Sequence, residues 1–106
     1  MNFTESYNVN SSLTEAVVLW TGWGKNPSPK RDDLSLTTRF GSEVASKLLL
    51  VVKSIEKEFY KSEAWKVAKD LNEMSKMATD DFKKDHPEIP DAISQAFAWC
   101  YTFDYK

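Results

Sequence analysis

The 106-residue sequence has few of the residues that build turn-rich, disulfide-bonded or metal-binding folds. It contains three glycines, four prolines, one cysteine and one histidine. So few glycines and prolines argue against disorder and against a turn-rich β-sandwich. A single cysteine excludes an intramolecular disulfide and is typical of a reducing compartment. With one cysteine and one histidine, a zinc site would need mostly carboxylate ligands, which is atypical of structural zinc.

Long apolar runs and a strong excess of charge are also missing. No apolar run approaches the roughly 18–20 residues of a membrane-spanning helix. The polar N-terminus lacks the basic residues and apolar core of a signal peptide. We therefore expect a cytoplasmic protein that does not bind membranes. The net charge of −2 argues against nucleic-acid binding, because such domains concentrate Lys and Arg.

The chain nevertheless has enough apolar residues for one well-packed domain. Apolar residues make up 42% of the sequence and aromatic residues 13%, and 106 residues is a typical length for one domain. We expect residues 1–106 to form that domain, with residues 1–11 only loosely attached because they are polar.

The stretch 42–60 is the most apolar part of the sequence and predicts a helix. Its apolar side chains recur at about 100° per residue and form one stripe. Leu49 and Leu50 lie off this stripe, so the middle of the helix is apolar nearly all round, and such a helix is buried on more than one side. We therefore predict an all-α fold, a compact bundle of four to five helices around this central and most buried helix. The stripe consists of Val44, Leu48, Val51, Val52, Ile55 and Phe59.

Local signals predict the helices that precede it. Ser12 and Glu15 form a capping-box pattern for a first helix, which Gly22 or Gly24 would end. Residues 34–40 are also helical in pattern. They form either a separate helix or the first turns of a bent long one, and the four-residue apolar spacing through Gly41 favours the latter.

Two further helices are predicted in the second half of the chain. Ser62 caps a helix that runs to the stop signal at residues 85–87, where Asp-His-Pro breaks helical structure. Another helix starts near Pro87 or Pro90 and reaches about Phe103. In this last segment the aromatic residues also alternate with the period of a strand, but a strand would need a partner, so we favour the helix.

The residue types that carry catalysis do not form a recognisable constellation. His86 is well explained as part of the helix stop, and Cys100 lies in an apolar context typical of a packed thiol. The adjacent carboxylates at 32–33 and at 80–81 point apart on a helix or serve as caps. The glycines at 22 and 24 do not join a strand to a helix, as a phosphate-binding loop requires. We therefore predict a protein with no catalytic residues, no metal and no cofactor.

Charge and aromatic residues suggest binding instead. Residues 47–69 contain six basic and three acidic side chains, whereas residues 70–91 contain three basic and seven acidic ones. The simplest reading is a set of solvated helix faces, and the alternative is an acidic ridge that attracts a basic partner. Trp and Tyr residues outside the apolar stripes could supply anchors, because both types are common at interface centres. The predicted partner-binding residues are Asp80, Asp81, Asp85, Glu88, Asp91, Trp99 and Tyr101.

The segment from residue 86 to residue 106 (HPEIPDAISQAFAWCYTFDYK) resembles the C-terminal ends of small helical bacterial immunity proteins. These proteins belong to contact-dependent growth inhibition and related polymorphic-toxin systems, and the size, acidity and helical pattern of the chain agree with that class. The resemblance implies a cytoplasmic inhibitor that binds the cognate toxin, often a nuclease, and covers its active site.

Two other classes of function compete with this expectation. One is a non-catalytic helical adaptor or regulatory subunit of another bacterial complex. The other is a small enzyme, which the missing catalytic constellation makes the weakest of the three. A toxic partner gene immediately upstream would separate the immunity protein from the adaptor, and turnover by the isolated protein would favour the enzyme.

Overall fold

The computed structural model describes residues 10–106, with side chains from Ser12 onward, and the prediction of an all-α fold is confirmed there. The predicted loose segment, residues 1–11, lies outside this range except for the helical backbone of its last two residues. Among the described residues, none of the helices is both long and apolar enough to cross a membrane. The helices are α1 (Asn10–Thr21), α2 (Asp33–Phe40), α3 (Ser42–Phe59), the single turn α4 (Ala64–Val67), α5 (Leu71–Asp85) and α6 (Asp91–Tyr105).

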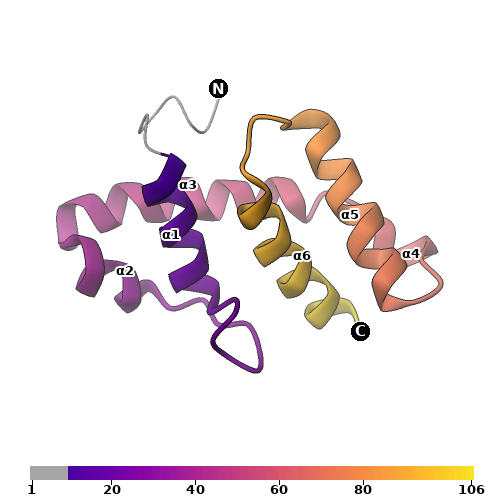
Figure 1. Ribbon diagram of the computed structural model, residues 1–106, viewed down its shortest axis with the longest axis horizontal. Helices are drawn as coiled ribbons and strands as arrows, with labels where there is room; N and C mark the ends of the chain where they lie inside the picture. Colours follow the sequence, from indigo (N-terminus) through magenta and orange to yellow (C-terminus); the bar gives the residue numbers. More distant parts are fainter. Residues whose placement is uncertain (1–9) are drawn as a thin grey trace.

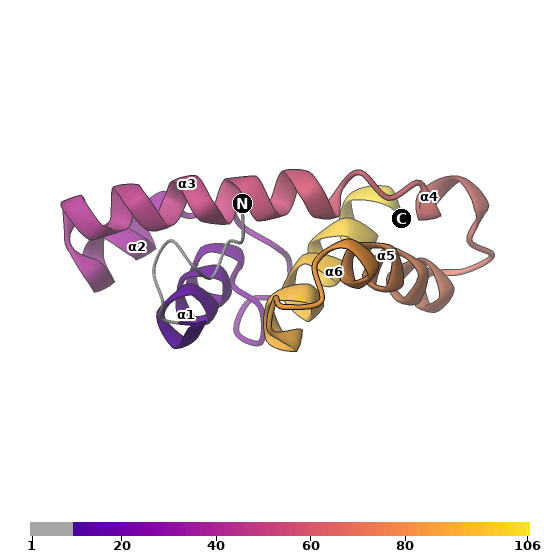
Figure 2. The ribbon, with the colours of Figure 1, turned by 90° about the horizontal axis from the view of Figure 1, so that it is seen from above.

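The helices form two layers. Helices α1, α6 and α5 lie side by side and cross over α3, which runs along the long axis of the molecule and stops before α4 (Figures 1 and 2). Helix α2 packs against α3 and also contacts α1, while α4 contacts α5 at the opposite end. The C-terminal segment is therefore a helix, as favoured above, and the alternation of its aromatic residues does not indicate a strand.

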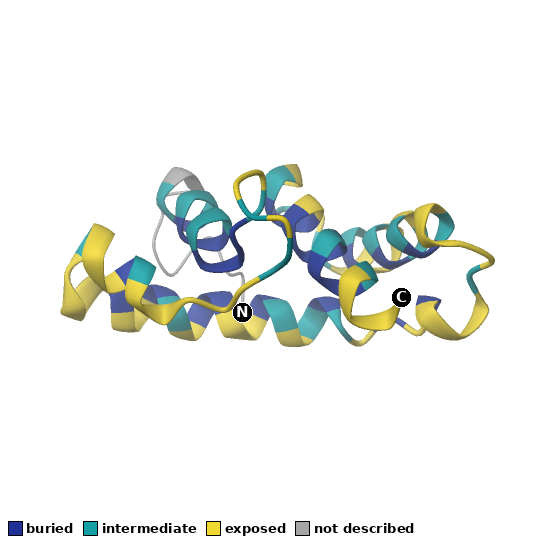
Figure 3. Cartoon of the chain, turned by 90° about the horizontal axis from the view of Figure 1, so that it is seen from below, coloured by how far each residue is buried: buried dark blue, intermediate teal, exposed yellow. Residues whose placement is uncertain are grey.

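Helix α3 is buried on one side only, unlike the expectation that the chain would wrap it. Its buried residues face the second layer, and its outer side is exposed to solvent (Figure 3). Val44 and Leu50 are exposed, with Leu50 at 71%, while Ala45 is buried instead. Helix α6 is more heavily buried than α3, since it buries seven of its 15 residues compared with six of 18 in α3.

A sharp turn at Gly41 separates α2 from α3, so the expected continuous helix is not formed. Gly41 adopts φ 81° and ψ 157°, a combination that is essentially restricted to glycine. Its amide donates to the carbonyl of Thr37, which closes the last turn of α2. The turn lets Leu36 reach the core from a helix that folds back along α3.

The predicted helix from Ser62 to residue 85 is also interrupted. Helix α4 ends at Val67, and Ala68 is extended before α5 begins at Leu71. The Asp70 carboxylate accepts a hydrogen bond from the amide of Glu73 at 2.8 Å, and the Glu73 carboxylate accepts one from the amide of Lys69 at 3.0 Å. These two bonds cap α5 in the manner of a capping box, which stabilises a new start at this position.

The first helix begins earlier than its predicted cap. Helix α1 starts at Asn10, so Ser12 lies inside it. The carboxylate of Glu15 pairs with Arg39 of α2, with Oε2 2.7 Å from Nε. The two helices are tied a second time by the indole N–H of Trp20, which donates to Asp33 at 2.8 Å.

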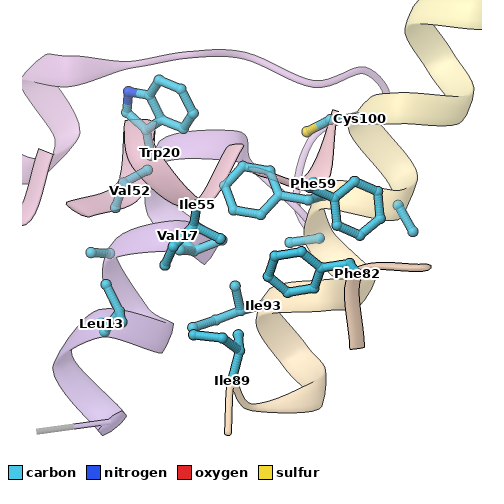
Figure 4. Close-up of a cluster of buried hydrophobic side chains, with 14 of the residues drawn as sticks. Leu13, Val17, Trp20, Val52, Ile55, Phe59, Phe82, Ile89, Ile93 and Cys100 are labelled. Carbon is cyan, nitrogen blue, oxygen red and sulfur yellow. The ribbon is translucent and has the colours of Figure 1, made fainter. Parts of the chain in front are cut away.

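The core lies between the two layers and is continuous across them. Leu13, Val17 and Trp20 of α1 meet Val52 and Ile55 of α3, as Figure 4 shows. The other end of the core is aromatic, with the rings of Phe59 and Phe82 5.3 Å apart. This aromatic end holds together the C-terminal ends of α3, α5 and α6, where the candidate site described next is found.

The one-sided burial of α3 predicts unequal costs for two similar substitutions. Leu48→Ala should lower the free energy of unfolding by about 2–5 kcal/mol, because it empties a packed site in the core. Leu50→Ala, on the outer side of the same helix, should change it by no more than about 0.5 kcal/mol. Urea denaturation of both variants measures the difference. Equal losses would contradict the burial of only one side.

Candidate partner-binding site

A groove of about 400 Å³ lies between the C-terminal ends of α3 and α5. One wall comes from α3 and the turn that follows it, and the other comes from the last turns of α5. The walls carry four carboxylates and two lysines, so the groove is acidic overall. We call it the acidic groove; the residues that line it are Glu58, Phe59, Lys61, Ser62, Glu63, Asp81, Phe82, Lys84, Asp85 and His86.

Two side-chain hydrogen bonds join the walls of the acidic groove. The Ser62 hydroxyl donates to the carboxylate of Asp81 at 2.7 Å. The Nε2 atom of His86 lies 3.3 Å from the carboxylate of Glu58. The His86 ring also packs against Phe82, with 5.0 Å between the ring centroids. Because His86 directly follows the last residue of α5, the predicted helix stop also brings an imidazole into the groove.

The carboxylates of the turn-side wall are held in their charged form. A hydrogen bond from Lys61, at 2.5 Å, lowers the pKa of Glu58, and His86 adds to this effect although partial burial opposes it. A hydrogen bond from Lys66 likewise lowers the pKa of Glu63. On the other wall, none of the ion pairs found among the described residues involves Asp85. Both walls of the groove therefore carry carboxylates, those of the turn-side wall paired with Lys61 and Lys66.

The predicted acidic ridge is divided by the structure. Asp81 and Asp85 line the acidic groove. Asp80 instead pairs with Lys76 at 2.7 Å, and Asp91 pairs with Lys83. Glu88 lies beside the groove, with its carboxylate 3.8 Å from Nδ1 of His86.

Sequence reasoning missed the carboxylates on the other wall, Glu58 and Glu63. Both fall in the segment 47–69, which has more basic than acidic side chains, so a charge count along the chain hides them. The signal that could have found them is the turn at residues 60–63, which follows a long helix and must bring its own side chains close to whatever packs against the helix end.

The two predicted aromatic anchors do not lie in the groove. Trp99 is half-buried against the core. Tyr101 is completely buried, with 0% exposure, so it cannot contact a partner in this conformation and is not part of the candidate site. Its hydroxyl donates to the carbonyl of Ser62 at 2.8 Å and accepts from the amide of Trp65 at 3.1 Å. Tyr101 therefore holds the turn that carries Glu63.

Two other aromatic residues do reach the surface close to the groove. The rings of Trp65 and Tyr105 stack with 5.4 Å between centroids and 9° between planes. Trp65 is 44% exposed and Tyr105 is 39% exposed. Trp65 follows Glu63 by two residues, so this stack lies beside the turn-side wall of the acidic groove.

A second polar cluster connects α3, α6 and the loop before α2. The guanidinium of Arg31 contacts Glu56 at 2.9 Å and Asp104 at 3.0 Å, and the hydroxyl of Tyr60 donates to Asp104 at 2.6 Å. Burial raises the pKa of Tyr60, and the bond to Asp104 adds to this shift. The nearby Cys100 is fully buried, and burial raises the pKa of its thiol to about 12. A neutral, buried thiol is a poor nucleophile, so this cluster is suited to holding the helices together.

The described part of the chain contains no group of three or more His, Cys, Asp or Glu side chains arranged to hold a metal ion. Comparisons with models of protein families, with curated proteins and with solved structures found no match to this chain.

The two hydrogen bonds of the Tyr101 hydroxyl predict how the turn after α3 responds when this hydroxyl is removed. Tyr101→Phe should lower the free energy of unfolding by about 1–3 kcal/mol, because it leaves a buried carbonyl without its partner. Amide exchange around residues 62–65 should accelerate more than exchange in α1. A variant with uniformly faster exchange, or with unchanged protection at Trp65, would contradict this role for the hydroxyl.

The raised pKa values predict a loss of stability in alkaline solution. The unfolded thiol ionises near pH 8.5 and unfolded tyrosines near pH 10, whereas Cys100 and Tyr60 resist ionisation in the folded state. Their contribution is therefore complete below about pH 8.5 and declines as the pH rises toward about 12. Urea denaturation between pH 7.5 and 10.5 measures the decline. Cys100→Ala should flatten its first part, and an identical slope in this variant would contradict the assignment.

Proposed function

We propose that this chain is an immunity protein that binds and neutralises a cognate toxin domain. The partner in this proposal is the C-terminal nuclease domain of a delivered effector, and the encounter takes place in the cytoplasm. The chain performs no catalysis of its own. Its action is to cover the basic surface with which the toxin holds its nucleic-acid substrate.

The observation that carries the proposal is the placement of four carboxylates on facing walls beside an exposed aromatic stack. A nuclease must present positive charge to bind phosphates, so an inhibitor that covers its active site benefits from negative charge. The acidic groove supplies that charge, with Asp81 and Asp85 opposite Glu58 and Glu63. The resemblance of residues 86–106 to immunity proteins points to the same class of partner.

The aromatic stack supplies what charge alone does not. Hot spots at interfaces are enriched in Trp and Tyr, and Trp65 and Tyr105 are both partly exposed and already stacked. Stacking restricts their rotamers before binding, so less side-chain entropy is lost when a partner covers them. In this proposal Trp65 and Tyr105 take the anchoring role that the sequence analysis expected of Trp99 and Tyr101.

The proposal predicts which charges accelerate binding to the cognate toxin domain. Asp81→Asn with Asp85→Asn should lower the association rate about 3–10-fold at low salt and flatten its salt dependence, because these charges face the partner. The matched control is Asp80→Asn with Asp91→Asn, which removes the same charge from carboxylates already paired with lysines. Its effect should be smaller. Association kinetics at about 50 mM and about 300 mM salt provide the measurement.

The same assay tests the anchor and the biological activity. Trp65→Ala should act mainly on the dissociation rate, because a buried aromatic contact holds the formed complex together and contributes little to the first encounter. Cells that express the toxin should survive when the wild-type chain is co-expressed. Failure to bind the toxin or to protect cells would refute the proposed function, and equal slowing by both charge pairs would refute the placement of the interface at the groove.

A further inference from the structure

We infer that the acidic groove receives a guanidinium group, the side chain of an arginine that projects from the partner. The inference rests on the proposed function for the existence of the partner, and it specifies the chemistry of the contact. The size of the groove, the charge of its walls and the imidazole of His86 in its lining each point to this occupant.

The groove has the size and the charge for one long cationic side chain. Its volume of about 400 Å³ exceeds that of a single side chain, so the stem of an arginine and a few waters fit together. The charge comes from two independent elements, since Glu58 and Glu63 belong to the end of α3 and its turn while Asp81 and Asp85 belong to α5. A cation between the walls is attracted by the carboxylates of both, although Lys61 and Lys66 already pair with Glu58 and Glu63 on the turn side.

The acceptor geometry favours a guanidinium over an ammonium group. A guanidinium carries five N–H donors in a planar fork and can bind carboxylates in pairs. Asp81 and Asp85 are one helical turn apart, so they lie on the same side of α5. The Ser62 hydroxyl occupies only one oxygen of the Asp81 carboxylate, which leaves further acceptor capacity.

The imidazole of His86 adds a second preference for arginine, whereas the Phe82 ring behind it is buried. Phe82 and His86 both line the groove, and their rings pack against each other at 5.0 Å. A planar, weakly hydrated guanidinium can stack on a ring, while a compact ammonium retains its hydration more strongly. The side chain of His86 is 19% exposed, so part of the imidazole is accessible from the groove.

The chain already provides a partial competitor for this place. The ammonium of Lys61 lies 2.5 Å from the carboxylate of Glu58, and the side chain of Lys61 is 65% exposed. An incoming guanidinium would displace this exposed lysine or share the carboxylate with it. Removing the Lys61 charge should therefore strengthen binding, whereas removing the carboxylates should weaken it. Opposite effects from neighbouring residues distinguish a specific site from general attraction.

The test is a titration of the ¹⁵N-labelled full chain with N-acetyl-arginine amide, followed by amide chemical shifts. Saturable shifts should appear in residues 58–63 and 81–86, with a Kd on the order of millimolar. The neutral isostere N-acetyl-citrulline amide should produce none, and N-acetyl-lysine amide should bind several-fold more weakly. Shifts elsewhere on the chain, or equal binding of the citrulline amide, would overturn the inference, and equal binding of the lysine amide would overturn the choice of guanidinium.

Variants complete the experiment. Asp81→Asn with Asp85→Asn should weaken arginine amide binding several-fold, and Lys61→Gln should strengthen it about 2-fold. Asp80→Asn with Asp91→Asn should leave it unchanged. Unperturbed shifts in α1 verify that each variant is folded. Because no toxin is present, the two proposals can fail separately. If the chain neutralises the toxin but the arginine amide causes no chemical-shift changes, only the guanidinium site is refuted. If the chain binds the arginine amide but does not recognise the toxin, only the immunity function is refuted.

Discussion

The hydroxyl of Tyr101 is the contact on which the arrangement of the candidate site depends. It binds the carbonyl of Ser62 and the amide of Trp65 together, from within a cluster of rings that includes Phe59 and Tyr105. The Ser62 carbonyl lies in the turn between α3 and α4, and the Trp65 amide lies at the start of α4, where amides have no partner within the helix. Buried polar groups without partners are costly. By satisfying them, one side chain of α6 fixes the turn that forms one wall of the acidic groove.

This dependence explains why a core tyrosine matters to a surface. From the fixed turn, Ser62 reaches across to Asp81, Glu63 lines the acidic groove, and Trp65 points outward to stack on Tyr105. The turn-side wall of the groove and the aromatic stack are therefore positioned by the same side chain. A rigid arrangement of this kind suits a binder, because less conformational entropy is lost on association.

The helices could largely be predicted from the sequence, because the apolar period of 42–60 and of the C-terminal segment reflects local geometry. What could not be predicted is how far each helix is covered. Leu50 looks like a core residue within its apolar run, yet it lies on the outer side of α3 because every packed helix is on the opposite side. The breaks were harder still. Gly41 permits either a bend or a reversal of the chain, and the packing of α2 on α3 determines which of the two forms.

The candidate site was only half predictable, for a related reason. Asp81 and Asp85 could be found from a count of charges along the chain, but Glu58 and Glu63 lie in a segment whose lysines outnumber its acids. The count treats all side chains of a segment as one surface, whereas a helix distributes them around its axis. Lys47, Lys53 and Lys57 are exposed on the same helix whose end contributes Glu58 to the groove. The lining of the groove therefore has more acidic than basic side chains, although the sequence segment 47–69 has more basic ones. Tyr101 shows the same limit for aromatic residues. Spacing identifies which residues lie off an apolar stripe, but only the packing around the turn decides that the Tyr101 ring is enclosed while Trp65 of α4 is exposed.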